Sequence, residues 1–114
     1  MTVPPIQNLS PDVSVAPQLG PQAMAPLAQA GFKSVINNRP DFEGGPDQPT
    51  SAAMEAAATA AGLRYAYLPV SPAVQTPEEI ARFAGLLAEL PKPVLAFCRS
   101  GTRSGKLYRA ATGG

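Results

Sequence analysis

The chain has 114 residues, of which 45% are hydrophobic, and a formal net charge of +1, so we predict one small globular domain. The near-neutral charge gives no reason to expect nucleic acid or an anionic membrane as a partner. The single cysteine excludes an internal disulfide. The absence of histidine excludes Ser–His and Cys–His catalytic pairs and removes the commonest metal ligand, so we predict neither a metal nor another cofactor.

The N-terminal region has no basic residue in residues 1–20 and no long apolar run, which predicts neither a signal peptide nor a membrane anchor. Together with the lone cysteine, this leads us to expect a cytoplasmic protein. We expect residues 1–10 to form a flexible arm and residues 11–114 to form a single domain.

The first elements of this domain are a strand, a helix and a second strand. Alternating polar and apolar residues predict the first strand over Asp12–Ala16. A helix over residues 20–30 follows, with a kink or boundary near Ala25 because Pro26 lies within it. An apolar segment then predicts the next strand over Phe32–Asn37.

A turn-rich loop over residues 38–49 separates this strand from a second helix. That helix is rich in alanine and runs to Ala61, with Thr50 or Ser51 as its N-cap. The third strand follows over Arg64–Val70.

The third helix has the clearest start in the sequence. Thr76 is its N-cap, Pro77 occupies the first helical position and Glu79 completes a capping box. The helix stops before the proline-containing turn that precedes the last strand, Pro93–Phe97. A short final helix is predicted over Gly105–Ala111.

Strands that alternate with helices predict an α/β fold, a small and mainly parallel sheet of four to five strands flanked by helices. Ligands of such sheets bind at the carboxyl ends of the strands. We therefore expect the loops over residues 37–47, residues 70–75 and the residues after Cys98 to meet at one edge, with the chain near Gln18 beside them.

The segment Cys98-Arg99-Ser100-Gly101-Thr102-Arg103-Ser104 joins the last strand to the last helix. Its backbone N–H groups are expected to converge at the helix N-terminus and bind an anion, with Gly101 supplying the positive φ that this needs. Arg103 adds a forked pair of donors. We predict a strongly lowered pKa for Cys98 and a thiolate that attacks phosphorus or sulfur. The plain alternative is that Cys98 is a small apolar residue at a strand end.

Other residues of this loop are candidates for anion binding. Ser100 and Thr102 are expected to contribute backbone amides rather than hydroxyls. Arg99 is either a further anion ligand or an exposed surface residue. Ser104 either caps the helix or places its hydroxyl near the sulfur.

The pattern Cys-x-x-Gly-x-Arg-Ser resembles the active loops of cysteine phosphatases and of rhodanese-type sulfurtransferases. Residues 6–111 also resemble the phosphatase-like domain of the bacterial beta-lactamase hydrolase-like proteins. That resemblance implies a fold like the dual-specificity phosphatases, with Cys98 as nucleophile and Arg103 as anion clamp. It rests on four further segments in the same order and spacing: Val35–Asp41, Gly62-Leu63, Tyr67–Val70 and Phe83–Leu87.

The sequence departs from the phosphatase pattern in three places. Four residues separate Cys98 from Arg103, which is the rhodanese-like length, whereas phosphatases have five. Phe97 stands where phosphatases usually carry a histidine. The loop Val70–Val74 has no carboxylate, although phosphatases usually take a general acid from a loop after an earlier strand.

Asp41 is the best substitute for that general acid, and its alternative role is that of a turn-forming residue after a proline. Arg39 either binds an anion or pairs with Asp41. We expect Glu43 and Asp47 to be solvated loop residues. Two tyrosines, Tyr65 and Tyr67, are expected to pack on the sheet.

Three functions fit these observations, and all of them take a small anionic partner. The first is a cysteine-dependent phosphatase that acts on a phosphate ester through Cys98, Arg103 and Asp41. The second is a sulfurtransferase that takes sulfur from a sulfane-sulfur donor as a persulfide on Cys98. The third is a non-catalytic domain that binds an anion or a partner protein.

Overall fold

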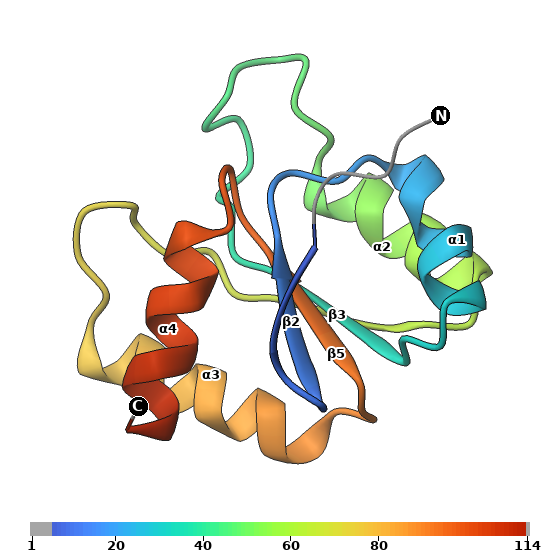
Figure 1. Ribbon diagram of the computed structural model, residues 1–114. Helices are drawn as coiled ribbons and strands as arrows, with labels where there is room; N and C mark the ends of the chain where they lie inside the picture. Colours follow the sequence, from blue (N-terminus) through green and yellow to red (C-terminus); the bar gives the residue numbers. More distant parts are fainter. Residues whose placement is uncertain (1–5, 114) are drawn as a thin grey trace.

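A five-stranded sheet forms the centre of the structure, a computed structural model that describes residues 6–113 (Figure 1). Strand β1 is antiparallel to β2, and β2, β5, β3 and β4 are parallel to one another. Their carboxyl ends therefore lie at one edge, as the alternation of strands and helices predicts. Across the sheet, the strands are β1 (Gln7–Ser10), β2 (Val13–Ala16), β5 (Val94–Phe97), β3 (Ser34–Asn37) and β4 (Arg64–Tyr67).

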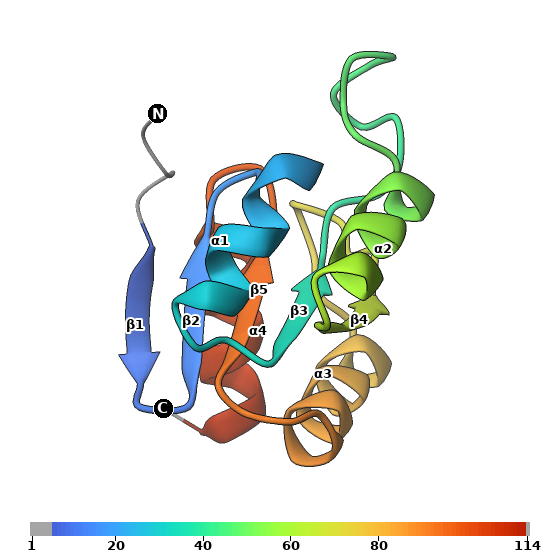
Figure 2. The ribbon, with the colours of Figure 1, turned by 90° about the vertical axis from the view of Figure 1, so that its right-hand side faces the viewer.

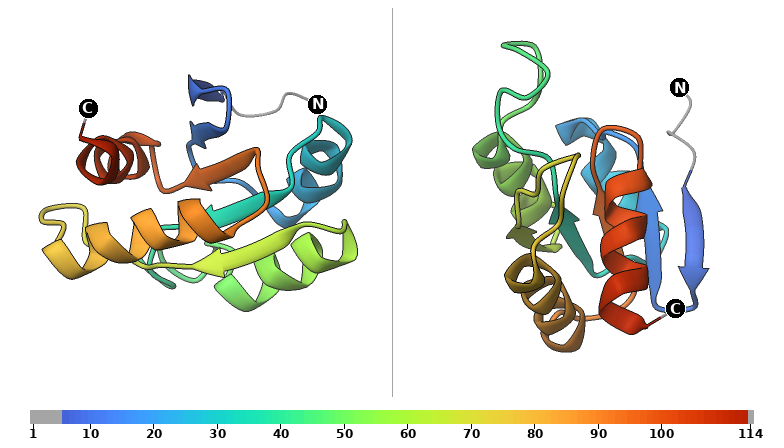
Figure 3. Two further views of the ribbon diagram at one scale, coloured as in Figure 1. Left: turned by 90° about the horizontal axis from the view of Figure 1, so that it is seen from below. Right: turned by 90° about the vertical axis from the view of Figure 1, so that its left-hand side faces the viewer.

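Helices cover both faces of the sheet (Figures 2 and 3). Leu95 and Phe97 of β5 pack in the core on the α1 and α2 side, whereas Val94 and Ala96 pack on the α3 and α4 side. Apolar residues thus point in both directions along one strand, as burial of a parallel sheet on both faces requires. The helical elements are η1 (Pro21–Ala23), α1 (Met24–Gln29), α2 (Ser51–Ala60), α3 (Pro77–Glu89) and α4 (Thr102–Thr112).

The predicted helix starts are confirmed where the sequence carries a cap. In α3 the Glu79 N–H donates to Thr76 Oγ1 at 3.1 Å and the Thr76 N–H donates to Glu79 Oε1 at 2.8 Å, which completes the capping box. In α2 the Ala53 N–H donates to the hydroxyl oxygen of Thr50, the N-cap. These bonds satisfy N–H groups that a helix leaves without partners in its first turn.

The bounds of several helices and strands differ from the sequence prediction. Strand β1, Gln7–Ser10, falls inside the predicted arm over residues 1–10, and residues 1–5 of that arm lie outside the described residues. The division into an arm and a domain over residues 11–114 stays a prediction. Helix α4 begins at Thr102 rather than Gly105, because the loop before it turns directly into the helix. A 3₁₀ turn precedes α1, in place of one helix with a kink.

Within residues 6–113, every helix is too short or too polar to cross a lipid bilayer.

Candidate active site

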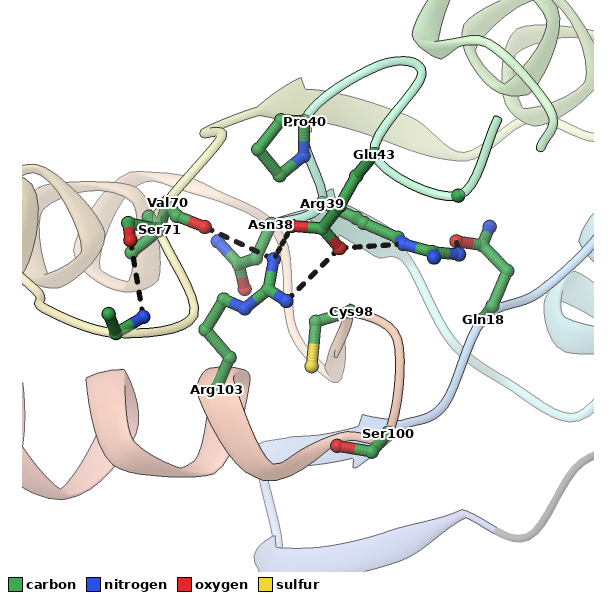
Figure 4. A network of polar contacts seen from close by, with 12 residues as sticks. Gln18, Asn38, Arg39, Pro40, Glu43, Val70, Ser71, Cys98, Ser100 and Arg103 are labelled. Carbon is green, nitrogen blue, oxygen red and sulfur yellow. Dashed lines mark hydrogen bonds and ion pairs between the residues drawn. The ribbon is translucent and has the colours of Figure 1, made fainter. Parts of the chain in front are cut away.

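Two loops meet at the carboxyl edge of the sheet, and we name them by their positions (Figure 4). The Cys98 loop comprises residues 98–104, after β5, and the β3–α2 loop comprises residues 38–50. Gln18, just after β2, joins them: its N–H donates to the Arg99 carbonyl and its Oε1 accepts from Arg39. The predicted meeting of these segments is therefore observed.

The Cys98 loop turns sharply through Gly101, which has φ of 90° and is the N-cap of α4. Its N–H donates to the Cys98 sulfur at 3.0 Å. A Cβ atom at this position would lie 3.4 Å from the carbonyl carbon of Ala16. That distance is an ordinary contact, so glycine is favoured here by the positive φ rather than by the space, as the sequence predicted for this position.

The surroundings of Cys98 favour its thiolate. Burial raises the pKa of the thiol, but hydrogen bonds outweigh this effect and leave the pKa below its ordinary value. The N–H groups within reach of the sulfur are those of Ser104, Ser100 and Gly101, and the Ser104 hydroxyl lies within reach as well. The direction of the predicted pKa shift is therefore confirmed, and the convergent amides that were expected to cause it are among its causes.

The Ser104 hydroxyl has a single hydrogen, and two acceptors compete for it. It donates to Asn38 Oδ1 at 2.8 Å, while Asn38 Nδ2 donates to the Leu68 carbonyl at 3.0 Å. Because the amide is fixed by that second bond, its oxygen needs a donor, and we assign the hydrogen to Asn38. The lowered pKa of Cys98 then rests mainly on backbone N–H groups.

The Arg103 side chain is 7% exposed and lies beside Cys98 (Figure 4). Its Nη1 donates to the Val70 carbonyl at 3.1 Å, and its two terminal nitrogens contact the two carboxylate oxygens of Glu43. Its Nε is buried and has no hydrogen-bond partner among the described residues. A buried N–H without an acceptor is costly, so this side of the guanidinium is suited to an incoming anion.

Glu43 is the functional residue that the sequence analysis missed. Its Oε1 accepts from Arg39 Nε at 2.9 Å and from Arg103 Nη2 at 3.1 Å, so one carboxylate joins two guanidinium groups. Burial raises its pKa, but hydrogen bonds from the two arginines outweigh this and lower it below the ordinary value. Glu43 is exposed, as predicted for a solvated loop residue, but its pairing with two arginines was not predicted. The four-residue spacing from Arg39 was the only sequence signal for the pair.

Side-chain hydrogen bonds hold the β3–α2 loop in place. Gln48 Oε1 accepts from the Gly44 N–H at 2.7 Å, and its Nε2 donates to the Pro40 carbonyl at 2.9 Å. The Asp41 N–H donates to the Tyr67 hydroxyl at 2.8 Å. This loop therefore presents Arg39 and Glu43 in a defined arrangement rather than as free surface groups.

Asp41, the predicted general acid, points elsewhere. Its Oδ1 accepts from the Ser51 N–H at 2.8 Å, at the first residue of α2. It is absent from the residues that line the cavity described below, and Arg39 pairs with Glu43 rather than with Asp41. The bond from the Ser51 N–H favours the alternative, a structural role in the turn, and also satisfies an N–H group in the first turn of α2.

A cavity of about 620 Å³ opens beside Arg103, and we call it the arginine cavity. Cys98 is 1% exposed and is not among the residues that line this cavity. Ser100 lines the cavity, whereas exposed Thr102 does not. Among residues 6–113, no three metal-binding side chains of His, Cys, Asp or Glu come together. The lining residues are Arg39, Glu43, Gly44, Pro72, Arg99, Ser100 and Arg103.

A family model matches residues 5–114 of this chain, and its description is "Beta-lactamase hydrolase-like protein, phosphatase-like domain". A beta-lactamase hydrolase-like protein of Agrobacterium fabrum is 45% identical over 82 residues, which are 72% of this chain and 19% of that relative. The chain therefore spans about a fifth of the length of that curated relative.

Two solved structures extend the comparison. A candidate phosphatase from Neisseria meningitidis superposes with a TM-score of 0.83 and 33% identity, over 90% of this chain and 72% of that one. Pseudomonas aeruginosa TpbA, in a complex with pTyr, gives a TM-score of 0.67 and 21% identity, over 96% of this chain and 64% of that one. These likenesses confirm the predicted fold of the dual-specificity type of cysteine phosphatase.

Proposed function

The chain belongs to the family of phosphatase-like domains of beta-lactamase hydrolase-like proteins, and from this premise we propose that it is a cysteine-dependent phosphatase-like hydrolase. Its nucleophile is the Cys98 thiolate, and its substrate is a phosphoric monoester. The observation that carries the proposal is the buried Nε of Arg103, which has no hydrogen-bond partner among residues 6–113, beside a thiol whose pKa is lowered. An anion bound there would satisfy the guanidinium and place its central atom near the sulfur.

The reaction has two steps. The thiolate attacks phosphorus, the S–P bond forms, and the P–O bond to the leaving group breaks with its electron pair on that oxygen. Water then attacks phosphorus, the S–P bond breaks, and inorganic phosphate and the thiolate are released. In both steps Arg103 Nε and the N–H groups of the Cys98 loop stabilise the charge on the oxygens of the transferring group.

The choice of leaving group follows from the carboxylates near the site. Glu43 has a lowered pKa and is ionised at neutral pH, so it holds no proton to donate. Asp41 is bonded to the start of α2. The proposed substrate is therefore an aryl phosphate, because a phenolate needs less protonation on departure than an alkoxide does.

Sulfur transfer is the second candidate, and the same lack of a protonated carboxylic acid in the arginine cavity favours it. The Cys98 thiolate attacks the sulfane sulfur of thiosulfate, an S–S bond forms, and sulfite leaves with the electron pair of the broken bond. Cyanide then takes the outer sulfur, giving thiocyanate and regenerating the thiolate. The four residues between Cys98 and Arg103, the rhodanese-like number, also suit this reaction.

A paired assay on one preparation tests both reactions. It measures phosphate released from p-nitrophenyl phosphate and thiocyanate formed from thiosulfate and cyanide, with Cys98→Ser as the control. Release of phosphate well above the control supports the hydrolase. Thiocyanate formation without phosphate release overturns it in favour of sulfur transfer. Loss of both, together with an alkylation rate of Cys98 typical of a free thiol at pH 6, would leave a non-catalytic binding domain.

A further inference from the structure

The arginine cavity is lined by more guanidinium groups than carboxylates. Three arginines line it, and Glu43 is the only carboxylate among the lining residues. Glu43 is shared by Arg39 and Arg103, while Arg99 lies exposed at the same cavity. With an anionic group on Arg103, Glu43 is the one carboxylate in the lining that is left for both Arg39 and Arg99.

Arg39 is fixed in the wall of this cavity. It is 9% exposed, and its Nε bonds Glu43 at 2.9 Å while its Nη1 donates to Gln18 Oε1 at 3.1 Å. Its Nη2 lies against Gly44, where a Cβ atom would come within 2.5 Å of it. That Nη2 makes no hydrogen bond to another of residues 6–113. Arg39 thus shares its carboxylate with Arg103 and lines the cavity, where its Nη2 is available to a ligand.

The two guanidinium groups are neighbours. Arg39 Nε and Arg103 Nη2 bond the same oxygen of Glu43, at 2.9 and 3.1 Å (Figure 4). Gln18 also ties Arg39 to the Cys98 loop, because its N–H donates to the Arg99 carbonyl at 3.2 Å. A ligand with two anionic groups a few bonds apart could therefore contact Arg103 with one and Arg39 with the other.

We infer that Arg39, with Arg99 beside it, forms a second anion subsite, and that the substrate is a small molecule with a carboxylate a few bonds from its reacting group. The inference rests on the proposed function, since it takes the first anionic group to be the one held by Arg103 and the Cys98 loop. It narrows the substrate class from any aryl phosphate or sulfane-sulfur donor to compounds that carry a second anionic group. Arg39 contributes forked, charge-assisted hydrogen bonds to that carboxylate.

The test compares two stable ligands of equal size that differ by one charge. They are phosphonoacetate and phosphonoacetamide, in which an uncharged carboxamide replaces the carboxylate. Affinities are measured by calorimetry on the whole chain, at a pH at which both phosphonates are doubly ionised. Protection of Cys98 from iodoacetamide is the second measurement and reports occupation of the Cys98 loop. The variants are Arg39→Gln, Arg39→Lys and, as a charge-matched control, Arg82→Gln on the exposed surface of α3.

The wild-type chain is expected to bind phosphonoacetate about tenfold more tightly than the amide. This ratio should fall to about two or less in Arg39→Gln and persist in Arg82→Gln. Arg39→Lys keeps a positive charge beside Glu43, so we expect it to fold even if Arg39→Gln does not. Its ratio of affinities should fall to about three, because an ammonium group cannot donate two parallel hydrogen bonds to a carboxylate.

Three results would overturn the inference, and they differ in what they say about the proposed function. If both ligands protect Cys98 with equal affinity, or if the ratio survives in both Arg39 variants, the second subsite is absent while anion binding at the Cys98 loop stands. If neither ligand protects Cys98, the anion site of the proposed function fails, and the second subsite fails with it.

Discussion

The two loops at the carboxyl edge of the sheet are held in different ways. In the Cys98 loop, backbone geometry dominates: Gly101 has positive φ, its N–H points at the sulfur, and α4 begins at the next residue. In the β3–α2 loop, side chains dominate, since Gln48 bonds both Gly44 and Pro40. The first loop positions the thiol, and the second sets the charges around it. Substitutions in the two loops should therefore impair activity in different ways.

Arg103→Lys is expected to have the largest effect, because Arg103 is where the two loops meet. Lysine keeps the charge but loses Nε and the fork to Glu43, so the transferring group loses stabilisation. We expect kcat for whichever substrate proves active to fall by about 10²- to 10³-fold. Thermal unfolding of the same variant is the control for folding. A loss below about fivefold would mean that the backbone amides alone hold the anion.

Glu43→Gln, a substitution in the β3–α2 loop, should have a smaller effect on activity. The variant keeps the shape of the side chain but removes the shared charge, so both arginines lose their fixed orientation. We expect kcat/KM to fall about tenfold, an effect of the size expected for a lost charged hydrogen bond. The thiol pKa of Cys98 should stay lowered, because backbone N–H groups of the other loop cause most of that shift.

A thiol pKa that returned to its ordinary value in Glu43→Gln would contradict this division of roles. It would mean that the β3–α2 loop supports the fold of the Cys98 loop rather than the orientation of the arginines. A rise in kcat/KM would instead identify Glu43 as a competitor of the substrate anion.

The pH dependence of Cys98 tests the first loop by itself. The rate of alkylation by iodoacetamide should have its midpoint below the ordinary thiol pKa of about 8.5, and in urea the midpoint should return to that value. Ser104→Ala should change the rate at pH 7 by less than about threefold, because the hydroxyl hydrogen lies on Asn38 and the backbone N–H remains. A larger change would assign that hydrogen to the sulfur.

The same lowered pKa has a consequence for stability. The native thiol releases its proton more readily than the unfolded one, so the unfolded chain binds more protons between the two pKa values. The free energy of unfolding should therefore rise with pH across that window. The contribution is complete above the unfolded pKa and is lost as the pH falls through the native one. Cys98→Ser should lack this rise in pH-dependent urea unfolding.

The difference between the loops also explains what the sequence could predict. The positive φ of Gly101 and the capping box at Thr76 depend on residues within a few positions of each other, and both were predicted correctly, whereas the start of α4 was predicted three residues late. The bond between Glu43 and Arg103 joins residues 60 positions apart, and nothing in either local sequence indicates it. Strand β1 was also missed, because a four-residue edge strand carries little apolar signal of its own.

Asp41 shows the same limit in a single residue. Its position after β3 at the correct edge of the sheet was predicted, but the direction of its carboxylate depends on where α2 begins. A loop of this length can present the side chain toward the cavity or toward the helix, and sequence alone does not choose between them. The acid role therefore remains the part of the predicted site with the least structural support.

Asp41→Ala should consequently have the smallest effect on activity. The variant loses the 2.8 Å bond from the Ser51 N–H and leaves that group of α2 unpaired, so the free energy of unfolding should fall by about 1 kcal/mol. We expect kcat to stay within about twofold of wild type, with Asp41→Asn recovering part of the stability because its side-chain oxygen can accept the same hydrogen bond. Urea unfolding and the paired assay measure the two effects separately. A fall in kcat above tenfold, with loss of the alkaline limb of the pH–rate profile, would make Asp41 the proton donor and place the second loop in the chemistry itself.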